Sequence, residues 1–272
     1  MSPRAELLER GFTVFPGVLS EAEVSAFRAI ADRLVAAQSE EDRRAHRALG
    51  SLISIWRAPE LAELITHPGA REIFSALGYP APCFSGGYLL SKPLGPTPTF
   101  WHQDWCFWDD PSSEELDPPQ IGLLYYLTPT SAGDGALRCL PGSQRTRHAL
   151  HDRLEAADLK SLRRVDDPGD ALFGSVAGEV AVGVRAGSAI AMDARLLHAA
   201  HPNRSARARP LITLWYFPRW ERLAEATRAF LGAPEPLEDW PSAPRERVRA
   251  MMRRYEGGAA PATPTERGPR LR

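Results

Sequence analysis

His102 and Asp104 are the two side chains whose types and spacing most clearly indicate chemistry. They lie in the run FWHQD, which ends at Asp104. Because side chains two residues apart in an extended strand point to the same face, one imidazole and one carboxylate could bind the same metal ion here. A second histidine far downstream, His198, would complete a face of three ligands. Two histidines and one carboxylate, with open coordination positions, are the ligand set of non-haem Fe(II) oxygenases.

The third ligand position has two candidates, His198 and His201. His198 follows a predicted apolar strand at 188–192, so a rigid strand end would support it. His201 instead precedes Pro202 in a turn signal. We therefore predict that His198 is the ligand, and that His201 is either a substrate contact or an ordinary surface residue.

Large aromatic side chains surround the His102–Asp104 pair in the sequence. They are Phe100, Trp101, Trp105, Phe107 and Trp108. The simplest alternative to a metal site is a surface histidine beside a capping aspartate, and this crowding argues against such an exposed loop. The rings could belong to the ordinary core, or they could form a dry wall that shields a reactive centre from water.

Arg209 begins a predicted strand, and strand alternation places it on the same face as Thr213 and Trp215. If this face points inward, burial of the guanidinium is costly unless a carboxylate meets it. A bound carboxylic acid would satisfy the guanidinium with a pair of hydrogen bonds. The alternatives are a salt bridge within the protein, or a strand that faces the other way and buries Arg207 instead.

Helices towards both ends and short strands between them are predicted to position these side chains. Ser20 and Glu23 form a capping box, and apolar residues at helical spacing follow it. The predicted helices cover 21–38, 59–65, 70–77, 221–231 and 245–255. The predicted strands cover 83–90, 121–127, 136–140, 180–184, 188–192 and 211–217. This pattern is typical of an all-β core with flanking helices, as in a β-sandwich or jelly roll.

The chain is expected to form a single domain over residues 1–255, followed by a tail at 256–272. The tail is poor in apolar side chains and is predicted to be disordered. The stretch 152–178 is predicted to be a long insertion between strands. A basic stretch overlaps its start, and we expect His148 and His151 to be exposed there and to have no catalytic role.

Composition argues against several classes of protein. Of 272 residues, 43% are apolar and 25% are charged, and the formal net charge is -1. This balance indicates neither nucleic acid nor a membrane as a partner, and no apolar run is long enough to span a bilayer. The N-terminus lacks the apolar stretch of a signal peptide, and the three separated cysteines are expected to be free thiols. We therefore predict a cytoplasmic protein, and the sequence leaves its oligomeric state open.

Taken together, these motifs resemble the phytanoyl-CoA dioxygenase family of Fe(II)/2-oxoglutarate-dependent oxygenases. The resemblance spans about residues 12–217. It rests on the run TFWHQDW at 99–105 with Trp108, on GAL at 135–137 with LPGS at 140–143, and on His198, Asn203, Ser205 and Arg209 in the distal pattern HxxxxNxSxxxR. The resemblance implies a double-stranded β-helix, which is a cupin-like jelly roll. It also implies that His102, Asp104 and His198 bind the iron.

For the cosubstrate, the resemblance implies that Arg209 holds the distal carboxylate of 2-oxoglutarate, and it places Thr99 and Trp108 nearby. The sequence departs from the family pattern at two positions. Ala200 removes a hydroxyl that assists 2-oxoglutarate binding in relatives, so another group must do this. Gln144 stands where a histidine often follows the Pro-Gly-Ser run.

The resemblance implies a reaction of Fe(II), 2-oxoglutarate and O2 in which a substrate is oxidised. We predict hydroxylation of a small organic molecule in specialised-metabolite biosynthesis, with desaturation, cyclisation and epimerisation left open. Asp104 disfavours halogenation, because related halogenases lack this carboxylate. One alternative is a cupin-like metal enzyme that does not use 2-oxoglutarate, which would have no need of an inward Arg209. The other is a non-catalytic small-molecule-binding protein on the same scaffold. We expect the substrate pocket to be formed by 52–56, 105–114 and 215–220.

Overall fold

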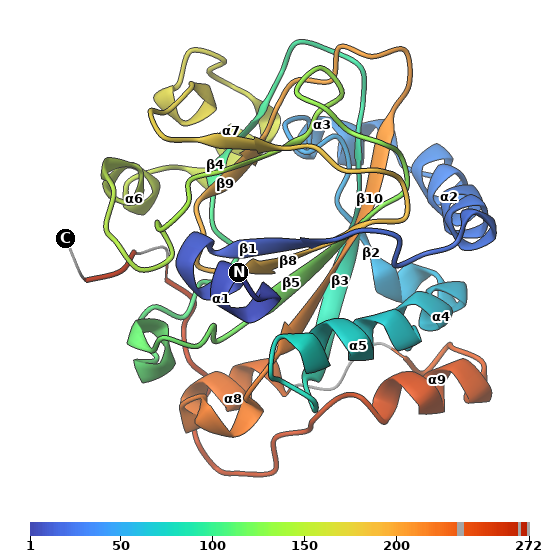
Figure 1. Ribbon diagram of the computed structural model, residues 1–272, viewed down its shortest axis with the longest axis vertical. Helices are drawn as coiled ribbons and strands as arrows, with labels where there is room; N and C mark the ends of the chain where they lie inside the picture. Colours follow the sequence, from blue (N-terminus) through green and yellow to red (C-terminus); the bar gives the residue numbers. More distant parts are fainter. Residues whose placement is uncertain (233–236, 266–267, 271–272) are drawn as a thin grey trace.

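Two antiparallel sheets face each other across a cavity in the computed structural model, which describes residues 1–232, 237–265 and 268–270 (Figure 1). The larger sheet has the strand order β1-β8-β5-β10-β3-β2. Its strands are β1 (Phe12–Phe15), β8 (Ala189–Asp193), β5 (Ile121–Tyr126), β10 (Arg209–Phe217), β3 (Cys83–Lys92) and β2 (Ile53–Ser54). The smaller sheet has the order β4-β9-β6-β7, with β4 (Thr99–His102), β9 (His198–Ala200), β6 (Leu137–Cys139) and β7 (Val180–Val182).

Helices pack on the outer sides of this two-sheet core, as the sequence predicts. Those before β3 are α1 (Pro3–Arg10), α2 (Glu21–Ala36), α3 (Glu40–Ala45), α4 (Ala62–Ile65) and α5 (Pro68–Ala76). The later ones are α6 (Ala149–Glu155), α7 (Leu159–Arg164), α8 (Glu225–Leu231) and α9 (Ser242–Arg249). The capping box is present at the start of α2: Ser20 Oγ accepts from the Glu23 amide, and Glu23 Oε2 accepts from the Ser20 amide. The helix ends two residues before the predicted boundary at 38.

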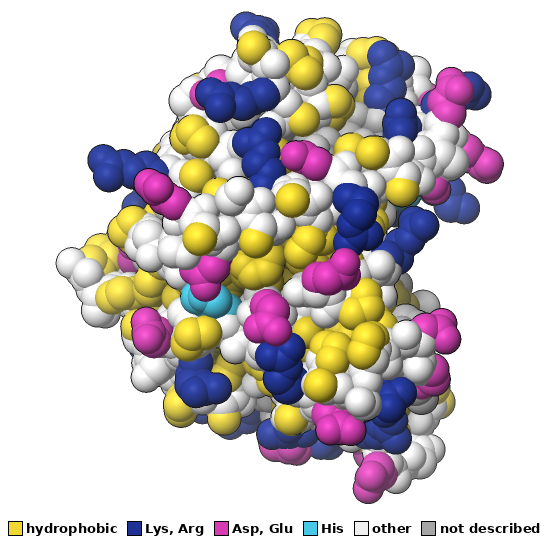
Figure 2. Space-filling model, turned by 90° about the vertical axis from the view of Figure 1, so that its right-hand side faces the viewer, with side chains coloured by type: hydrophobic (Ala, Val, Ile, Leu, Met, Phe, Trp, Pro, Cys, Tyr) yellow, Lys and Arg dark blue, Asp and Glu magenta, His cyan; other side chains and the backbone are white. Residues whose placement is uncertain are grey.

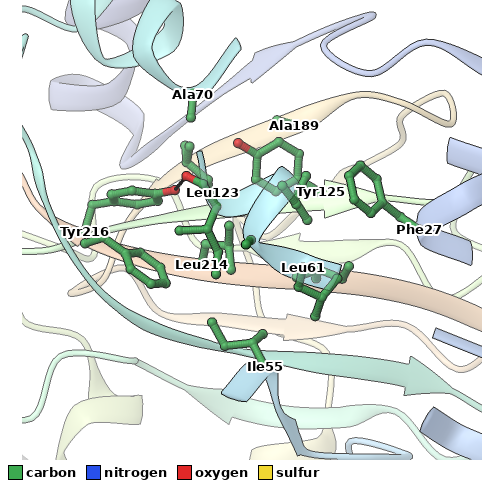
Figure 3. Close-up of a cluster of buried hydrophobic side chains, with 14 of the residues drawn as sticks. Phe27, Ile55, Leu61, Ala70, Leu123, Tyr125, Ala189, Leu214 and Tyr216 are labelled. Atoms are coloured by element: carbon green, nitrogen blue, oxygen red, sulfur yellow. Dashed lines mark hydrogen bonds between the residues drawn. The ribbon is translucent and has the colours of Figure 1, made fainter. Parts of the chain in front are cut away.

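Strand β10 separates the core from the cavity, because its alternate side chains point in opposite directions. Ile212, Leu214 and Tyr216 are fully buried in the main hydrophobic cluster beneath the helices, where Leu214 and Tyr216 lie with Leu123 of β5 (Figure 3). The other set of β10 side chains lines the cavity. It comprises Arg209, Leu211, Thr213 and Trp215. The predicted inward face of this strand is therefore confirmed.

The predicted insertion between strands lies between β6 and β7 and contains α6 and α7. Its apolar side chains pack with Phe100 and Trp101 of β4. One expectation here is wrong: His151 is fully buried rather than exposed. It is the third residue of α6, and its Nδ1 accepts a hydrogen bond from the His148 amide, so its ring caps the helix on the inner side.

The segment after residue 255 contacts the domain in its described part. The Ala262 amide donates to the Ala226 carbonyl, and Thr265 pairs with Phe107 in an isolated β-bridge. The predicted disorder of the tail as a whole stays a prediction, as does the single-domain boundary at 255. Residues 266–267 and 271–272 lie outside the described residues.

Basic and acidic side chains are interspersed over the face drawn in Figure 2. This distribution agrees with the formal net charge of -1. Within the described ranges, no helix has both the length and the apolar character required to cross a membrane.

Candidate metal and cosubstrate site

His102 and His198 lie directly opposite each other on the antiparallel strands β4 and β9, with ring centroids 4.1 Å apart. Each Nδ1 bonds a backbone carbonyl two residues earlier in the chain: Phe100 O at 2.9 Å and Leu196 O at 3.0 Å. A carbonyl only accepts, so each Nδ1 carries the proton and each Nε2 keeps a free lone pair. This is the usual way in which a protein orients a metal-binding histidine.

Asp104 approaches the two histidines from a turn. The strand-alternation argument for this residue is wrong in its mechanism, because β4 ends at His102. The amides of Asp104 and Trp105 instead both donate to the Ala194 carbonyl, at 2.9 and 2.8 Å. Asp104 Oδ2 accepts from Trp215 Nε1 at 3.0 Å, and Oδ1 lies 3.9 Å from His102 Nε2 and 3.8 Å from His198 Nε2. One carboxylate oxygen is thus held by the protein, and the other faces the imidazoles.

The donor set of this triad fits Fe(II). One ligand atom from each of His102, Asp104 and His198 lies within 4.8 Å of the other two. Burial and the neighbouring His198 lower the pKa of His102 to about 4, so its ring is neutral at physiological pH, as metal binding requires. All three residues line the cavity, so an ion that they held would keep coordination positions available to a ligand bound there.

The cavity that the triad faces has a volume of about 360 Å³ and is lined by both sheets. This volume is within the ordinary range for small-molecule sites. Each predicted pocket segment contributes one lining residue: Leu52, Cys106 and Trp215. The sequence reasoning missed the lining contributed by β3, β5 and α7, because apolar strand residues give no sign of which face they present.

Arg209 lies in this cavity as a buried cation without a counter-charge. Its side chain is 5% exposed, and Nε and Nη1 have no hydrogen-bond partner. Desolvation lowers the pKa of the guanidinium, which shows the cost of its burial. Among the described residues no salt bridge involves Arg209, and Arg207 is exposed, so neither alternative from the sequence describes this strand. An orphaned buried guanidinium facing a cavity fits the carboxylate of a bound ligand.

Tyr126 of β5 is a second orphaned group beside Arg209. Its hydroxyl is buried without a hydrogen-bond partner, and the Arg209 Cζ lies 5.7 Å from the ring centroid. The residue lines the cavity, whereas Ala200 on the opposite sheet offers no hydroxyl. Tyr126 therefore offers an unpaired hydroxyl donor beside Arg209. Tyr126 lies in an apolar run that is typical of an ordinary core strand, so the sequence did not indicate its place in the cavity.

Lys92 is a second buried basic side chain next to Arg209, and the sequence reasoning also missed it. The two residues are Cα partners across β3 and β10, and Lys92 is 2% exposed. Its Nζ donates to the Ala48 carbonyl at 2.6 Å and to Thr99 Oγ1 at 3.2 Å. Burial, followed by repulsion from Arg209, lowers the pKa of Lys92 well below its ordinary value. The lowered pKa favours the neutral amine, and a carboxylate bound beside Arg209 would favour the protonated form again.

The two other predicted cosubstrate residues lie in different places. Thr99 lines the cavity, and its hydroxyl also donates to the Ala48 carbonyl. Trp108 is not among the lining residues; it packs with Trp105, Phe107 and other apolar side chains beyond the cavity wall. A cosubstrate role for either residue stays a prediction.

The remaining sequence motifs hold the site in place. Asn203 is fully buried, and its Nδ2 donates to the carbonyls of Lys92 and Arg207, which fixes the turn between β9 and β10. Ser143 Oγ accepts from the Leu197 amide at 2.9 Å, just before His198. Gly135 has φ +74°, a backbone conformation that favours glycine, and it lies beside Arg209, since an added Cβ would be 3.5 Å from the Arg209 Nε.

His198 and His201 are expected to respond differently to substitution. The structure brings His198, but not His201, into the triad; the His201 amide donates to the carbonyl of Ala136, just before β6. We expect His198→Ala to lose bound iron in a metal assay, whereas His201→Ala retains it. Iron loss in His201→Ala with retention in His198→Ala would contradict the ligand assignment.

Comparison with known proteins relates most of the chain to one family. A family model described as phytanoyl-CoA dioxygenase (PhyH) matches residues 7–211. A curated protein from Stutzerimonas stutzeri, described as a probable alpha-ketoglutarate-dependent hypophosphite dioxygenase, is 30% identical over 126 residues. The match covers 46% of this chain and 41% of that protein, so the chain spans less than half of this relative's length.

Solved structures show the same fold. The non-haem alpha-ketoglutarate-dependent carbocyclase SnoK from nogalamycin biosynthesis is 25% identical, with a TM-score of 0.57 over 79% of this chain and 82% of SnoK. The epimerase SnoN, from the same biosynthesis, is 19% identical, with a TM-score of 0.59 over 96% and 94%. HygX from Streptomyces hygroscopicus, solved with nickel and 2-oxoglutarate, is 19% identical, with a TM-score of 0.57 over 79% and 86%. The predicted fold class, a jelly-roll-like core with flanking helices, is confirmed.

Proposed function

Because the chain belongs to the phytanoyl-CoA dioxygenase family, we propose that it is an Fe(II)- and 2-oxoglutarate-dependent dioxygenase that oxidises a small organic molecule. One observation carries the proposal: a triad of two histidines and a carboxylate shares its cavity with an unpaired buried arginine. A metal enzyme without 2-oxoglutarate would have no reason to bury Arg209 there without a counter-charge.

Each group of this site has a definable task in the proposed reaction. His102, Asp104 and His198 would hold the iron, which with 2-oxoglutarate and O2 supplies oxidation of the substrate coupled to formation of succinate and CO2. Arg209 would bind the distal carboxylate of 2-oxoglutarate through its planar fork, and Tyr126 would donate a further hydrogen bond. The apolar strand residues around them exclude water from the reacting centre.

We further propose hydroxylation as the outcome and a specialised metabolite as the substrate. Support for a specialised metabolite comes from the carbocyclase and the epimerase of nogalamycin biosynthesis, whose folds this chain shares. Those two relatives also show that one fold serves reactions other than hydroxylation, so the outcome depends on where the substrate is held.

Anaerobic titration tests the proposal directly. Fe(II) and 2-oxoglutarate added to the purified protein are expected to produce a weak visible charge-transfer band that saturates at one equivalent of each. His198→Ala should not produce the band, whereas His201→Ala should. Absence of the band in the wild type, with iron bound, would contradict the use of 2-oxoglutarate.

Lys92 predicts a pH dependence of 2-oxoglutarate binding. Its pKa is lowered in the free protein, and a carboxylate bound beside Arg209 would raise it again, so binding takes up a proton in the pH range between the two values. Affinity should therefore fall as pH rises through that range, by at most about tenfold per unit for one proton.

Calorimetry in buffers of different ionisation enthalpy measures this proton uptake, with anaerobic Fe(II) held at saturation. Lys92→Met keeps the length of the side chain and should abolish the buffer dependence. A wild-type binding enthalpy that is the same in every buffer would show that Lys92 does not change its protonation.

A further inference from the structure

The outer part of the cavity is formed by the insertion between β6 and β7. Helix α7 contributes Leu159 and Arg163 to the lining, four residues apart and therefore on one face of the helix. The Arg163 carbonyl accepts from the Ala48 amide at 2.9 Å, which ties α7 to the segment that carries Leu49 and Leu52. These two leucines, with Leu159, form an apolar wall next to Arg163.

Arg163 is a second cation of this cavity without a counter-charge. In the described part of the chain, Arg163 forms no ion pair or side-chain hydrogen bond, whereas its neighbour Arg164 bonds Asp166 at 2.6 Å. The described lining has one acidic side chain, Asp104, and this is a member of the metal triad. Arg163 lines the same cavity as His102, Asp104 and His198, so its side chain lies on the cavity side of α7.

Arg163 and Arg209 reach the cavity from different walls. Arg209 is buried on the larger sheet beside Tyr126 and Lys92, whereas Arg163 is half-buried on α7. If 2-oxoglutarate occupies the Arg209 end, Arg163 remains available to a second ligand. The leucine wall and the indole of Trp215 line the same cavity.

From this arrangement we infer that the substrate carries an anionic group, a carboxylate or a phosphate, which Arg163 binds while an apolar body lies against Leu49, Leu52 and Leu159. This inference deepens the proposed function and rests on it. A planar guanidinium binds either oxyanion with two hydrogen bonds, so it would orient the substrate as well as attract it. The position of the anionic group relative to the triad would then decide which carbon is oxidised.

The experiment compares three eight-carbon probes on the anaerobic Fe(II)/2-oxoglutarate-loaded protein: octanoate, octyl phosphate and the neutral octanamide. Dissociation constants come from calorimetry and from the change in the charge-transfer band. At least one anionic probe should bind about 10- to 100-fold more tightly than the amide, as expected for hydrogen bonds to a charged group. The tighter anion of the two identifies carboxylate or phosphate.

Three variants assign this preference to Arg163. Arg163→Met should remove it, and Arg163→Lys should restore part of it. Arg164→Met, on the same helix but paired with Asp166, should retain it. Equal binding of anions and amide by the wild type, or an unchanged preference in Arg163→Met, would overturn the inference.

The dissociation constant of 2-oxoglutarate, measured in each variant, separates the two proposals. It should be unchanged in Arg163→Met; weakening there would mean that Arg163 binds the cosubstrate instead, which would also overturn the inference. If the wild type did not bind 2-oxoglutarate, the proposed function would be contradicted. The probe measurements could still be made on the protein loaded with Fe(II) alone, so the two failures are distinguishable.

Discussion

Asp104→Ala is expected to abolish coupled turnover while the protein stays folded. The carboxylate is one of three protein ligands in the triad. Substitution of a residue that only supports a metal ligand typically lowers affinity or activity by about 10- to 100-fold, so loss of the ligand itself should exceed about 100-fold. The variant also removes the acceptor of Trp215 Nε1, one hydrogen bond with a net worth of about 1 kcal/mol.

Iron content, succinate formation and thermal unfolding of the purified variant measure these effects. Asp109→Ala is the matched control, because Asp109 is an exposed carboxylate of the same loop and does not line the cavity. It should keep iron and activity. If Asp104→Ala turned over like the wild type, Asp104 would not be a ligand of the metal.

The second large effect is expected at Arg209. Removal of one partner of a buried charge pair costs about 2–5 kcal/mol, or roughly thirty-fold to several-thousand-fold in affinity. Arg209→Ala should therefore raise the dissociation constant of 2-oxoglutarate by this factor and change iron binding much less. The measurement is a 2-oxoglutarate titration of each folded variant at saturating Fe(II).

Variants around Arg209 test the geometry of the anchor. Arg209→Lys should recover part of the affinity, since one ammonium cannot reproduce the planar fork. Arg207→Ala should change little, because Arg207 is exposed. Tyr126→Phe removes only the hydroxyl. It should weaken the binding of 2-oxoglutarate by about tenfold, which corresponds to one hydrogen bond to a charged group. A larger loss of 2-oxoglutarate affinity in Arg207→Ala than in Arg209→Ala would show that Arg207, and not Arg209, faces the cosubstrate.

Local patterns were sufficient to predict much of this site. His102 and His198 stand in short segments whose residue types already indicate metal binding, and alternation along β10 correctly placed Arg209 on the inward face. These inferences depend only on strand geometry, which is the same in every sheet. Asp104 was included in the triad for the wrong reason, because a turn held by the Ala194 carbonyl depends on a contact some 90 residues away in the chain.

Other parts of the site depend on long-range packing and could not be predicted. Tyr126 and Lys92 belong to strands whose sequence is compatible with either face, and only the pairing with β10 shows which face meets the cavity. Arg163 belongs to an insertion without strand periodicity, so its direction is set by the packing of α7. The basic residues around His151 in the sequence predict exposure, whereas its position in α6 buries the side chain.

Strand β10 carries both Arg209 and Trp215, the partner of Asp104, and is hydrogen-bonded to β3 on one side and β5 on the other. The strand therefore fixes the distance between Arg209, which would bind the cosubstrate, and Trp215, which holds the metal ligand Asp104. A slip of one residue would turn both side chains into the hydrophobic core at once. Strand slippage in this protein would consequently inactivate it in one step, without a form that had lost only one of the two anchors.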